Sequence, residues 1–123
     1  MSKVFVVQLP RRRNPRTGEW EEYDISVASV YGMLQQPLFD RKGAEFTTAP
    51  AVAKLKSELK DYCDDDSVLA LGDPAAIAVT AVVAAEMNRG KFSILRWDGR
   101  TRQYVRLEFD TRPSSSLRNV SNS

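Results

Sequence analysis

The stretch SVLALGDPAAIAVTAVVAAEMNRGKFSILRW, residues 67–97, decides the fold because it has the pattern of a strand, a helix and a second strand. Ser67–Leu71 is a short apolar run, and the Asp-Pro pair that follows is typical of a helix N-cap and first turn. A helix over Ala75–Met87 should stop before Gly90, which suits the left-handed conformation beyond a helix end. Lys91–Trp97 is then the next strand. The pattern predicts a βαβ unit with parallel strands and a right-handed crossover.

The central helix is apolar nearly all round, with Thr80 and Glu86 as its main polar residues. Such a helix is expected to be buried on most sides. A single sheet cannot cover it completely. We therefore expect cover either from a second helix over residues 48–62 and from residues 26–46, or from a homo-oligomer.

The second helix is indicated by Thr48 as N-cap, a proline in the first turn and apolar residues at helical spacing on one face, and it should end near Cys63. Upstream, Lys3–Leu9 is a β-branched run that predicts an inner strand. Glu19–Ile25 is then expected to be the return strand of a hairpin, with the loop RRRNPRTG between the two. Between these elements, Ser26 could cap a short helical turn that Gly32 ends, Asp40-Arg41-Lys42-Gly43 predicts a turn, and Leu38-Phe39 and Glu45-Phe46-Thr47 are short β-prone pieces.

These elements predict a small α/β domain, with α+β as an alternative class. It would contain a mixed sheet, the βαβ unit, two main helices and a C-terminal hairpin whose last strand is Tyr104–Asp110. We expect one domain over residues 1–110. Residues 111–123 lack periodicity and are rich in Ser and Asn, which predicts a disordered tail.

The composition excludes several classes of chemistry. The chain of 123 residues has no histidine and one cysteine, Cys63, so catalysis by Ser-His-Asp or Cys-His groups and imidazole zinc sites are excluded. Acidic neighbours blunt the nucleophilicity of Cys63. The longest apolar run, 75–85, is too short to span a bilayer, which needs about 20 residues. With no signal-like N-terminus, we expect a cytoplasmic protein that needs no cofactor.

Two aspartates could form a metal site. Asp73 and Asp98 each follow a strand of the βαβ unit, and ligands gather at the carboxyl ends of parallel strands. Mg²⁺ could bind there with help from residues 64–66. The simpler interpretation is favoured: Asp73 caps a helix, Asp98 starts a turn and the acidic run is a solvated loop. We therefore expect no metal and no enzyme activity.

Arginine outnumbers lysine twelve to six, although the net charge is only +2. Arginine suits bidentate recognition of phosphate or carboxylate. Its abundance could also reflect a GC-rich coding sequence. The arginines concentrate in the N-terminal loop and in the C-terminal hairpin, where an aromatic could stack on a base. The candidate contact residues are Arg11, Arg12, Arg13, Arg16, Arg96, Arg100, Arg102, Tyr104 and Arg106.

The segments LPRRR (9–13), YDIS (23–26), YG (31–32), LGDPAAIA (71–78) and RWDGRTRQY (96–104) together resemble small proteins encoded by tailed bacteriophages. The resemblance covers most of residues 1–110. It implies expression inside an infected bacterium and a role in host takeover, genome handling or particle assembly. It assigns no catalytic or binding residue.

Three functional hypotheses follow. The first is a non-enzymatic protein that binds nucleic acid or a nucleoprotein through its arginine-rich hairpins. The second is a protein-interaction or virion component that self-associates or binds an acidic protein surface. The third, ranked last, is a Mg²⁺-dependent phosphoryl-transfer enzyme.

Overall fold

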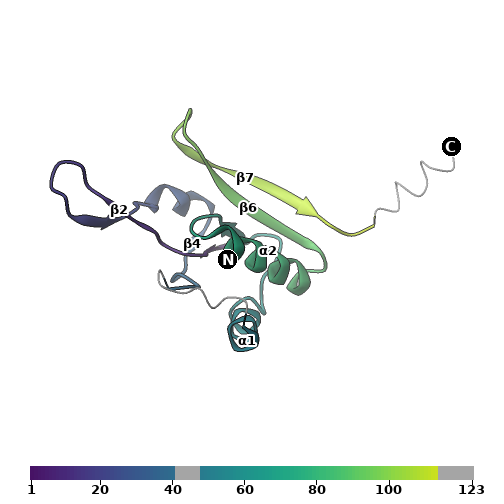
Figure 1. Ribbon diagram of the computed structural model, residues 1–123. Coiled ribbons are helices and arrows are strands. Elements are labelled where there is room, and N and C mark those ends of the chain that lie inside the picture. The colour runs from purple at the N-terminus through teal and green to yellow at the C-terminus, as the bar shows by residue number, and fades with distance from the viewer. Residues whose placement is uncertain (41–47, 114–123) are drawn as a thin grey trace.

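A mixed five-stranded sheet lies at the centre of the computed structural model, which describes residues 1–40 and 48–113 (Figure 1). All neighbouring strands are parallel except for the last pair, which forms the C-terminal hairpin. The α/β class, the mixed sheet and the hairpin are therefore confirmed. The strands lie in the order β4 (Met33–Leu34), β1 (Lys3–Val6), β5 (Ser67–Leu69), β6 (Lys91–Asp98) and β7 (Gln103–Asp110).

The βαβ unit is formed by β5, α2 (Pro74–Met87) and β6, with Val68 opposite Ile94. As predicted, Asp73 is the N-cap of α2, and its Oδ1 accepts a hydrogen bond of 2.8 Å from the backbone N–H of Ala75. Gly90, with φ +89°, follows the helix end. The N-terminal cap is thus as predicted, whereas at the other end the C-cap is Asn88, and Arg89, with φ +56°, takes the left-handed position expected of Gly90.

Gln8, just after β1, fastens the junction between β5 and α2. Its Oε1 accepts from the N–H of Asp73 at 2.7 Å, and its Nε2 donates to the carbonyl of Asp40 at 2.9 Å. Gly72 has φ +106°, and a Cβ at that position would collide with the side chain of Gln8. Glycine is needed here for both its backbone conformation and its small size.

The second helix, α1 (Ala49–Glu58), packs against α2. The predicted cap is present, since Thr48 Oγ1 accepts from the N–H of Ala51 at 3.3 Å. The helix ends at Glu58, several residues before the predicted end near Cys63, because a turn follows directly. Leu59 and Tyr62 are nevertheless buried and belong to the core between the helices and the sheet.

The prediction that α2 is buried on most sides is wrong. Ala76, Thr80, Val83 and Ala84 are buried, whereas the side chain of Val82 is 58% exposed. Residues 48–62 and 26–46 were expected to cover α2, and they do so in part, because α1, Leu38 and Phe39 contribute to the same core. They leave a stripe of α2 open to solvent. The exposed residues of this stripe are Ala75, Ala78, Val82 and Glu86.

The predicted pairing of Lys3–Leu9 with Glu19–Ile25 is also wrong. β1 is an inner strand with β4 on one side and β5 on the other, so neither edge is free for a return strand. The predicted arginine loop instead begins with a strand, β2 (Arg11–Arg13), which pairs antiparallel with β3 (Trp20–Glu22). This hairpin is a separate two-stranded sheet that extends away from the centre (Figure 1).

The face of the sheet opposite the two helices is covered by η1 (Ser26–Tyr31), a 3-10 helix. Its Ala28 is buried in a second core cluster with Val4, Leu95 and Tyr104. Ser26 is not the cap that we expected, since Ile25 occupies that position. Gly32 ends the helix as predicted.

Three predicted segments lie wholly or partly outside the described residues. The turn at 40–43 and the β-prone piece 45–47 lie, apart from Asp40, outside the described residues, and the predicted tail is described only to Pro113. Thr111 still donates its N–H to the carbonyl of Gly90 at 2.8 Å. The ordered hairpin thus continues slightly past the predicted boundary at residue 110.

A buried tyrosine joins the helices to both strands of the βαβ unit. The hydroxyl of Tyr62 accepts from the N–H of Ser93 at 3.0 Å and donates to the carbonyl of Asp66 at 3.1 Å. Burial raises the pKa of Tyr62 to about 12. The start of β5 and the start of β6 are therefore held by one hydroxyl group.

Replacing Tyr62 by Phe should lower the free energy of unfolding by about 1–3 kcal/mol, because a buried donor and a buried acceptor lose their partner. Since the folded-state pKa is raised, the wild type should lose stability as the pH rises from about 10 to about 12, and Tyr62→Phe should lose less over that range. Urea titrations measure both effects. The exposed Tyr23→Phe is the control, and an equal loss in both variants would contradict the assignment.

Replacing Asp73 by Ala should lower the free energy of unfolding by about 1 kcal/mol through loss of the helix cap. Asp73→Asn should keep most of that stability because Asn is an equally good cap. Mg²⁺ should leave the melting temperature of the wild type unchanged. A Mg²⁺-dependent rise in the melting temperature that disappears in both Asp73→Asn and Asp98→Asn would instead indicate a metal site.

Candidate functional site

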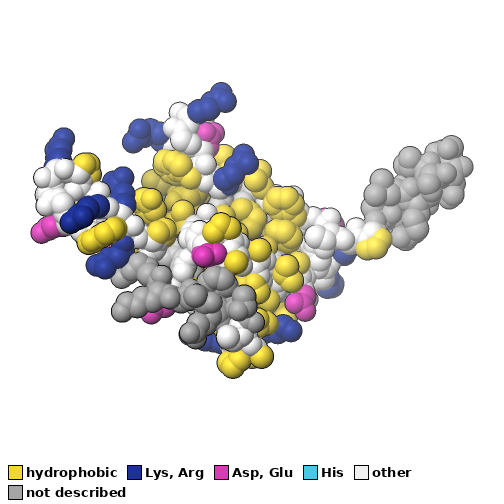
Figure 2. Space-filling view, in the orientation of Figure 1, with side chains coloured by type: hydrophobic (Ala, Val, Ile, Leu, Met, Phe, Trp, Pro, Cys, Tyr) yellow, Lys and Arg dark blue, Asp and Glu magenta, His cyan; other side chains and the backbone are white. Residues whose placement is uncertain are grey.

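Two hairpins that carry most of the candidate arginines leave the sheet at the same edge. β1 and β6 both run parallel to β5, so the segments that follow them emerge at the carboxyl edge of the sheet. β1 leads into the β2–β3 hairpin, and β6 leads into the tip of the β6–β7 hairpin, residues 99–102. Figure 2 shows Lys and Arg side chains gathered on these two projecting parts. We call them the N-terminal prong (residues 11–22) and the C-terminal prong (residues 96–104).

The bases of the two prongs are linked through Tyr104. The hydroxyl of Tyr31 in η1, which follows the N-terminal prong, donates to the carbonyl of Tyr104 at 2.7 Å. The ring of Trp97 meets that of Tyr104 edge-on, with centroids 5.0 Å apart. Burial, together with the charge of Asp24, which follows the N-terminal prong, raises the pKa of Tyr104. The segment that follows the N-terminal prong is thus tied to the base of the C-terminal prong.

In the N-terminal prong, two arginines are partly committed to the hairpin itself. Arg12 lies 3.6 Å from Glu21, and its guanidinium is 5.8 Å from the ring centre of Tyr23. Arg13 lies over the ring of Trp20 and donates to the carbonyl of Gly18. Contacts of this kind on an exposed hairpin contribute little to stability. Within the described residues, the side chains of Arg11 and Arg16 have no hydrogen-bond or ion-pair partner.

The C-terminal prong carries a different arrangement. Asp98 holds the turn, because its side chain accepts from the N–H of Arg100 at 2.9 Å and its carbonyl accepts from the N–H of Arg102 at 2.8 Å. The guanidinium groups of Arg96, Arg100 and Arg102 are exposed and have no partner among the described residues. Trp97, 45% exposed, lies beside them in the sequence. Two hydrogen bonds thus hold the turn, and its guanidinium groups remain available for a partner.

Two of the candidate contact residues, Tyr104 and Arg106, make contacts within the protein and are not available to a partner. Tyr104 is buried in the second core cluster, so its ring cannot reach a base, and Trp97 is the exposed aromatic of the prong. Arg106 is half-buried, and its guanidinium donates to Ser67 Oγ at 3.0 Å and to the carbonyl of Asp64 at 2.6 Å. Neither residue belongs to the exposed surface that we expected. Trp20, 58% exposed, is the exposed aromatic of the N-terminal prong and was not among the predicted contact residues.

The acidic run 64–66 lies at the opposite, amino edge of the sheet, because it precedes β5 whereas Asp73 follows it. The expectation that these residues help Asp73 bind a metal is therefore wrong. Asp66 is buried and accepts from the N–H groups of Lys3 and Cys63. Its carboxylate is used to organise the backbone at this edge.

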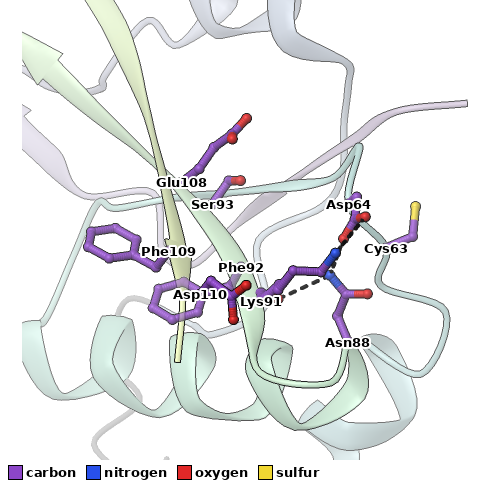
Figure 3. A pocket seen from close by; sticks show the side chains of 9 residues that line it. All are labelled: Cys63, Asp64, Asn88, Lys91, Phe92, Ser93, Glu108, Phe109 and Asp110. Atoms are coloured by element: carbon purple, nitrogen blue, oxygen red, sulfur yellow. Dashed lines mark hydrogen bonds and ion pairs between the residues drawn. The ribbon is translucent and has the colours of Figure 1, made fainter. Parts of the chain in front are cut away.

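Asp64 lines a hollow of about 360 Å³ at the same edge (Figure 3). It forms an ion pair of 3.0 Å with Lys91 and accepts a hydrogen bond from Asn88 Nδ2 at 2.9 Å. The hydrogen bond from Asn88 and then that from Lys91 are the largest causes that lower the pKa of Asp64. In Figure 3 the three side chains point toward one another across the start of β6. The polar groups of the hollow thus largely satisfy one another.

Among residues 1–40 and 48–113, no three acidic or cysteine side chains are grouped closely enough to bind a metal ion. In the same part of the chain, no helix has the length and apolar character required to cross a bilayer.

Comparison with known proteins identifies one family. The family model described as Phage Pam3 gp32-like protein matches residues 2–111. Neither curated proteins nor solved structures give a significant match. The predicted phage origin is confirmed, because the match spans nearly all of the described chain. The chain belongs to the Phage Pam3 gp32-like protein family.

Proposed function

We propose that this phage protein binds nucleic acid through its two prongs, inside the cytoplasm of the infected bacterium. The observation that carries the proposal is the placement of both prongs at one edge of the sheet by parallel strands. Guanidinium groups that leave the sheet at one edge can contact phosphates of the same nucleic-acid strand.

The available charge is unevenly distributed between the prongs. The N-terminal prong contains Glu19, Glu21 and Glu22, which offset most of its arginines. The C-terminal prong contains a single acid, Asp98, whose carboxylate is held by the turn. The C-terminal prong is therefore the primary contact, and the N-terminal prong adds contacts beside it.

Arginines elsewhere in the sheet support this assignment by contrast. Arg112, beside the amino edge, forms two hydrogen bonds with Asp110, which lowers the pKa of that carboxyl group to about 2. Arg106 bonds backbone carbonyls and Glu108. The arginines of the C-terminal prong lack such partners in the described residues. Arg106 and Arg112 are paired, whereas the cations of the C-terminal prong are free, and this contrast favours a binding role for the prong.

Exposed tryptophans favour single-stranded nucleic acid. Trp97 in one prong and Trp20 in the other are both substantially exposed. An exposed indole next to free guanidinium groups can stack on an unpaired base while the arginines contact phosphates. A duplex offers no unpaired base to such a surface.

The first prediction concerns salt. Binding of the full chain to a single-stranded oligonucleotide should weaken with salt, with a slope of log K against log salt of about −0.7 per phosphate contact. The double variant Arg100→Ala/Arg102→Ala should therefore reduce the slope by about 1.4. The melting temperature should remain unchanged, because exposed charges contribute only about 0.5 kcal/mol or less to the free energy of unfolding.

The matched control is Arg89→Ala/Arg112→Ala, which removes the same charge at the amino edge. Arg89 and Arg102 both have φ +56°, so each double variant replaces one residue in the left-handed conformation, and any effect of that conformation on stability is matched. An equal loss of slope in both would indicate a general charge effect. Absence of salt-sensitive binding by the wild type to any DNA or RNA at low ionic strength would end the proposal.

The second prediction concerns stacking. Trp97→Ala should weaken single-strand binding by roughly 5- to 150-fold, since base stacking on an aromatic is worth about 1–3 kcal/mol, and Trp97→Phe should retain part of it. Fluorescence anisotropy with labelled single-stranded and duplex oligonucleotides measures the difference. Similar losses on both substrates would show that Trp97 acts on the shape of the hairpin and not on a base.

A further inference from the structure

β7 ends the sheet with an unusually open edge. Its eight residues pair with β6 without a bulge, and within the described chain nothing pairs with its other side. β4, at the opposite end of the sheet, has only two residues. Soluble proteins protect long edges with charged residues, especially lysine, and with proline, bulges or short strands. β7 has charged residues, Arg106, Glu108 and Asp110, but it is long and has no lysine, proline or bulge.

Two hydrogen bonds show which residues of β7 face the free edge. Thr111 donates its N–H to Gly90, so Asp110, one residue earlier, turns its N–H and C=O away from β6. Independently, the carbonyl of Tyr104 accepts from Tyr31 and not from β6. Because the orientation alternates, Arg106 and Glu108 also present their main-chain groups to the free edge.

The charges along this edge are complementary to themselves. Arg106 and Glu108 flank Leu107, and they lie on the sheet face opposite the two helices, 3.0 Å apart. If two copies of β7 pair antiparallel with Leu107 on the two-fold axis, Arg106 of each copy lies opposite Glu108 of the other. Placing the axis at Arg106 or at Glu108 would oppose like charges, and placing it at Phe109 would oppose Glu108 to Asp110.

The helix-side face of β7 supports the same arrangement. Val105, Leu107 and Phe109 point to this side, but α2 lies over β6 and leaves Phe109 44% exposed. The rings of Phe109 and Phe92 stack with centroids 5.0 Å apart. An apolar hollow of about 520 Å³ that includes Val82 lies between α2, the start of β6 and Thr111, the residue after β7. In Figure 2 hydrophobic side chains form a continuous surface between the hairpin and α2.

We infer that β7 pairs antiparallel with β7 of a second copy of this chain, with Leu107 at the two-fold axis, to form one continuous sheet. Each Arg106–Glu108 pair across the axis exchanges both main-chain hydrogen bonds. On the helix side, the apolar residues of the two strands form a single patch between the two α2 helices. The interface uses none of the exposed arginine and tryptophan side chains of the prongs.

The register can be tested by disulfide formation in the full chain with Cys63→Ser. Leu107 faces its own symmetry mate at a non-hydrogen-bonded site, where Cα atoms are about 4.5 Å apart, a distance that suits a disulfide. Leu107→Cys should therefore form a covalent dimer on mild oxidation. Val105→Cys should not, because the two copies of residue 105 would lie about 13 Å apart along the strands. Equal cross-linking of both variants would overturn the proposed register.

Sedimentation of the wild type provides the second measurement, without nucleic acid. It should show a concentration-dependent dimer, and Glu108→Lys should raise the dissociation constant about tenfold by opposing two cations. Glu58→Lys, the same charge change on an exposed position of α1, should leave it unchanged. A wild type that stays monomeric at millimolar concentration, or that forms open-ended assemblies, would overturn the inference whether or not the prongs bind nucleic acid.

Discussion

The parallel pairing of β5 with β1 and β6 is the constraint on which the rest of the structure depends. It sends every segment that follows an inner strand to one edge and every segment that precedes one to the other. At the amino edge, acidic groups are used internally: Asp64 pairs with Lys91, and Asp66 accepts from backbone N–H groups. At the carboxyl edge the arginines of the C-terminal prong keep their charge available. Strand direction thus places the paired Lys91 and the free arginines of the C-terminal prong at opposite edges of the sheet.

Elements with local signals were predictable from the sequence, and elements defined only by distant partners were not. Asp73 and Thr48 cap their helices as expected, since a cap requires only the next few residues. The strand Arg11–Arg13 was missed because an exposed, charged strand has no apolar alternation to reveal it. β4 was missed because two residues carry no periodicity. The burial of α2 was overestimated because alanine and valine on all sides do not show which side a neighbour will cover.

The site was predictable only in part, for a related reason. The arginines that form the prongs are visible in the sequence, but their use depends on packing. Trp97 and Tyr104 are opposite each other on the same face of the hairpin, and η1, from more than seventy residues earlier, decides that Tyr104 is the buried one. In the same way, Arg106 is drawn onto the sheet by its hydrogen bond to Ser67, which lies on the other side of β6, and is therefore not exposed like its neighbours. No local pattern distinguishes these residues from their exposed neighbours.

The two proposed surfaces share the β6–β7 hairpin but use different parts of it. The prong lies at the turn, whereas the pairing edge is centred on Leu107, about 17 Å or more along the strand from the turn at about 3.4 Å per residue. Antiparallel pairing would therefore direct the two C-terminal prongs away from each other, to opposite ends of one joined sheet. Such a dimer could bind two segments of nucleic acid, and its avidity would depend on the spacing between those segments. A phage protein built in this way gains reach from the rigidity of a sheet, without a flexible linker.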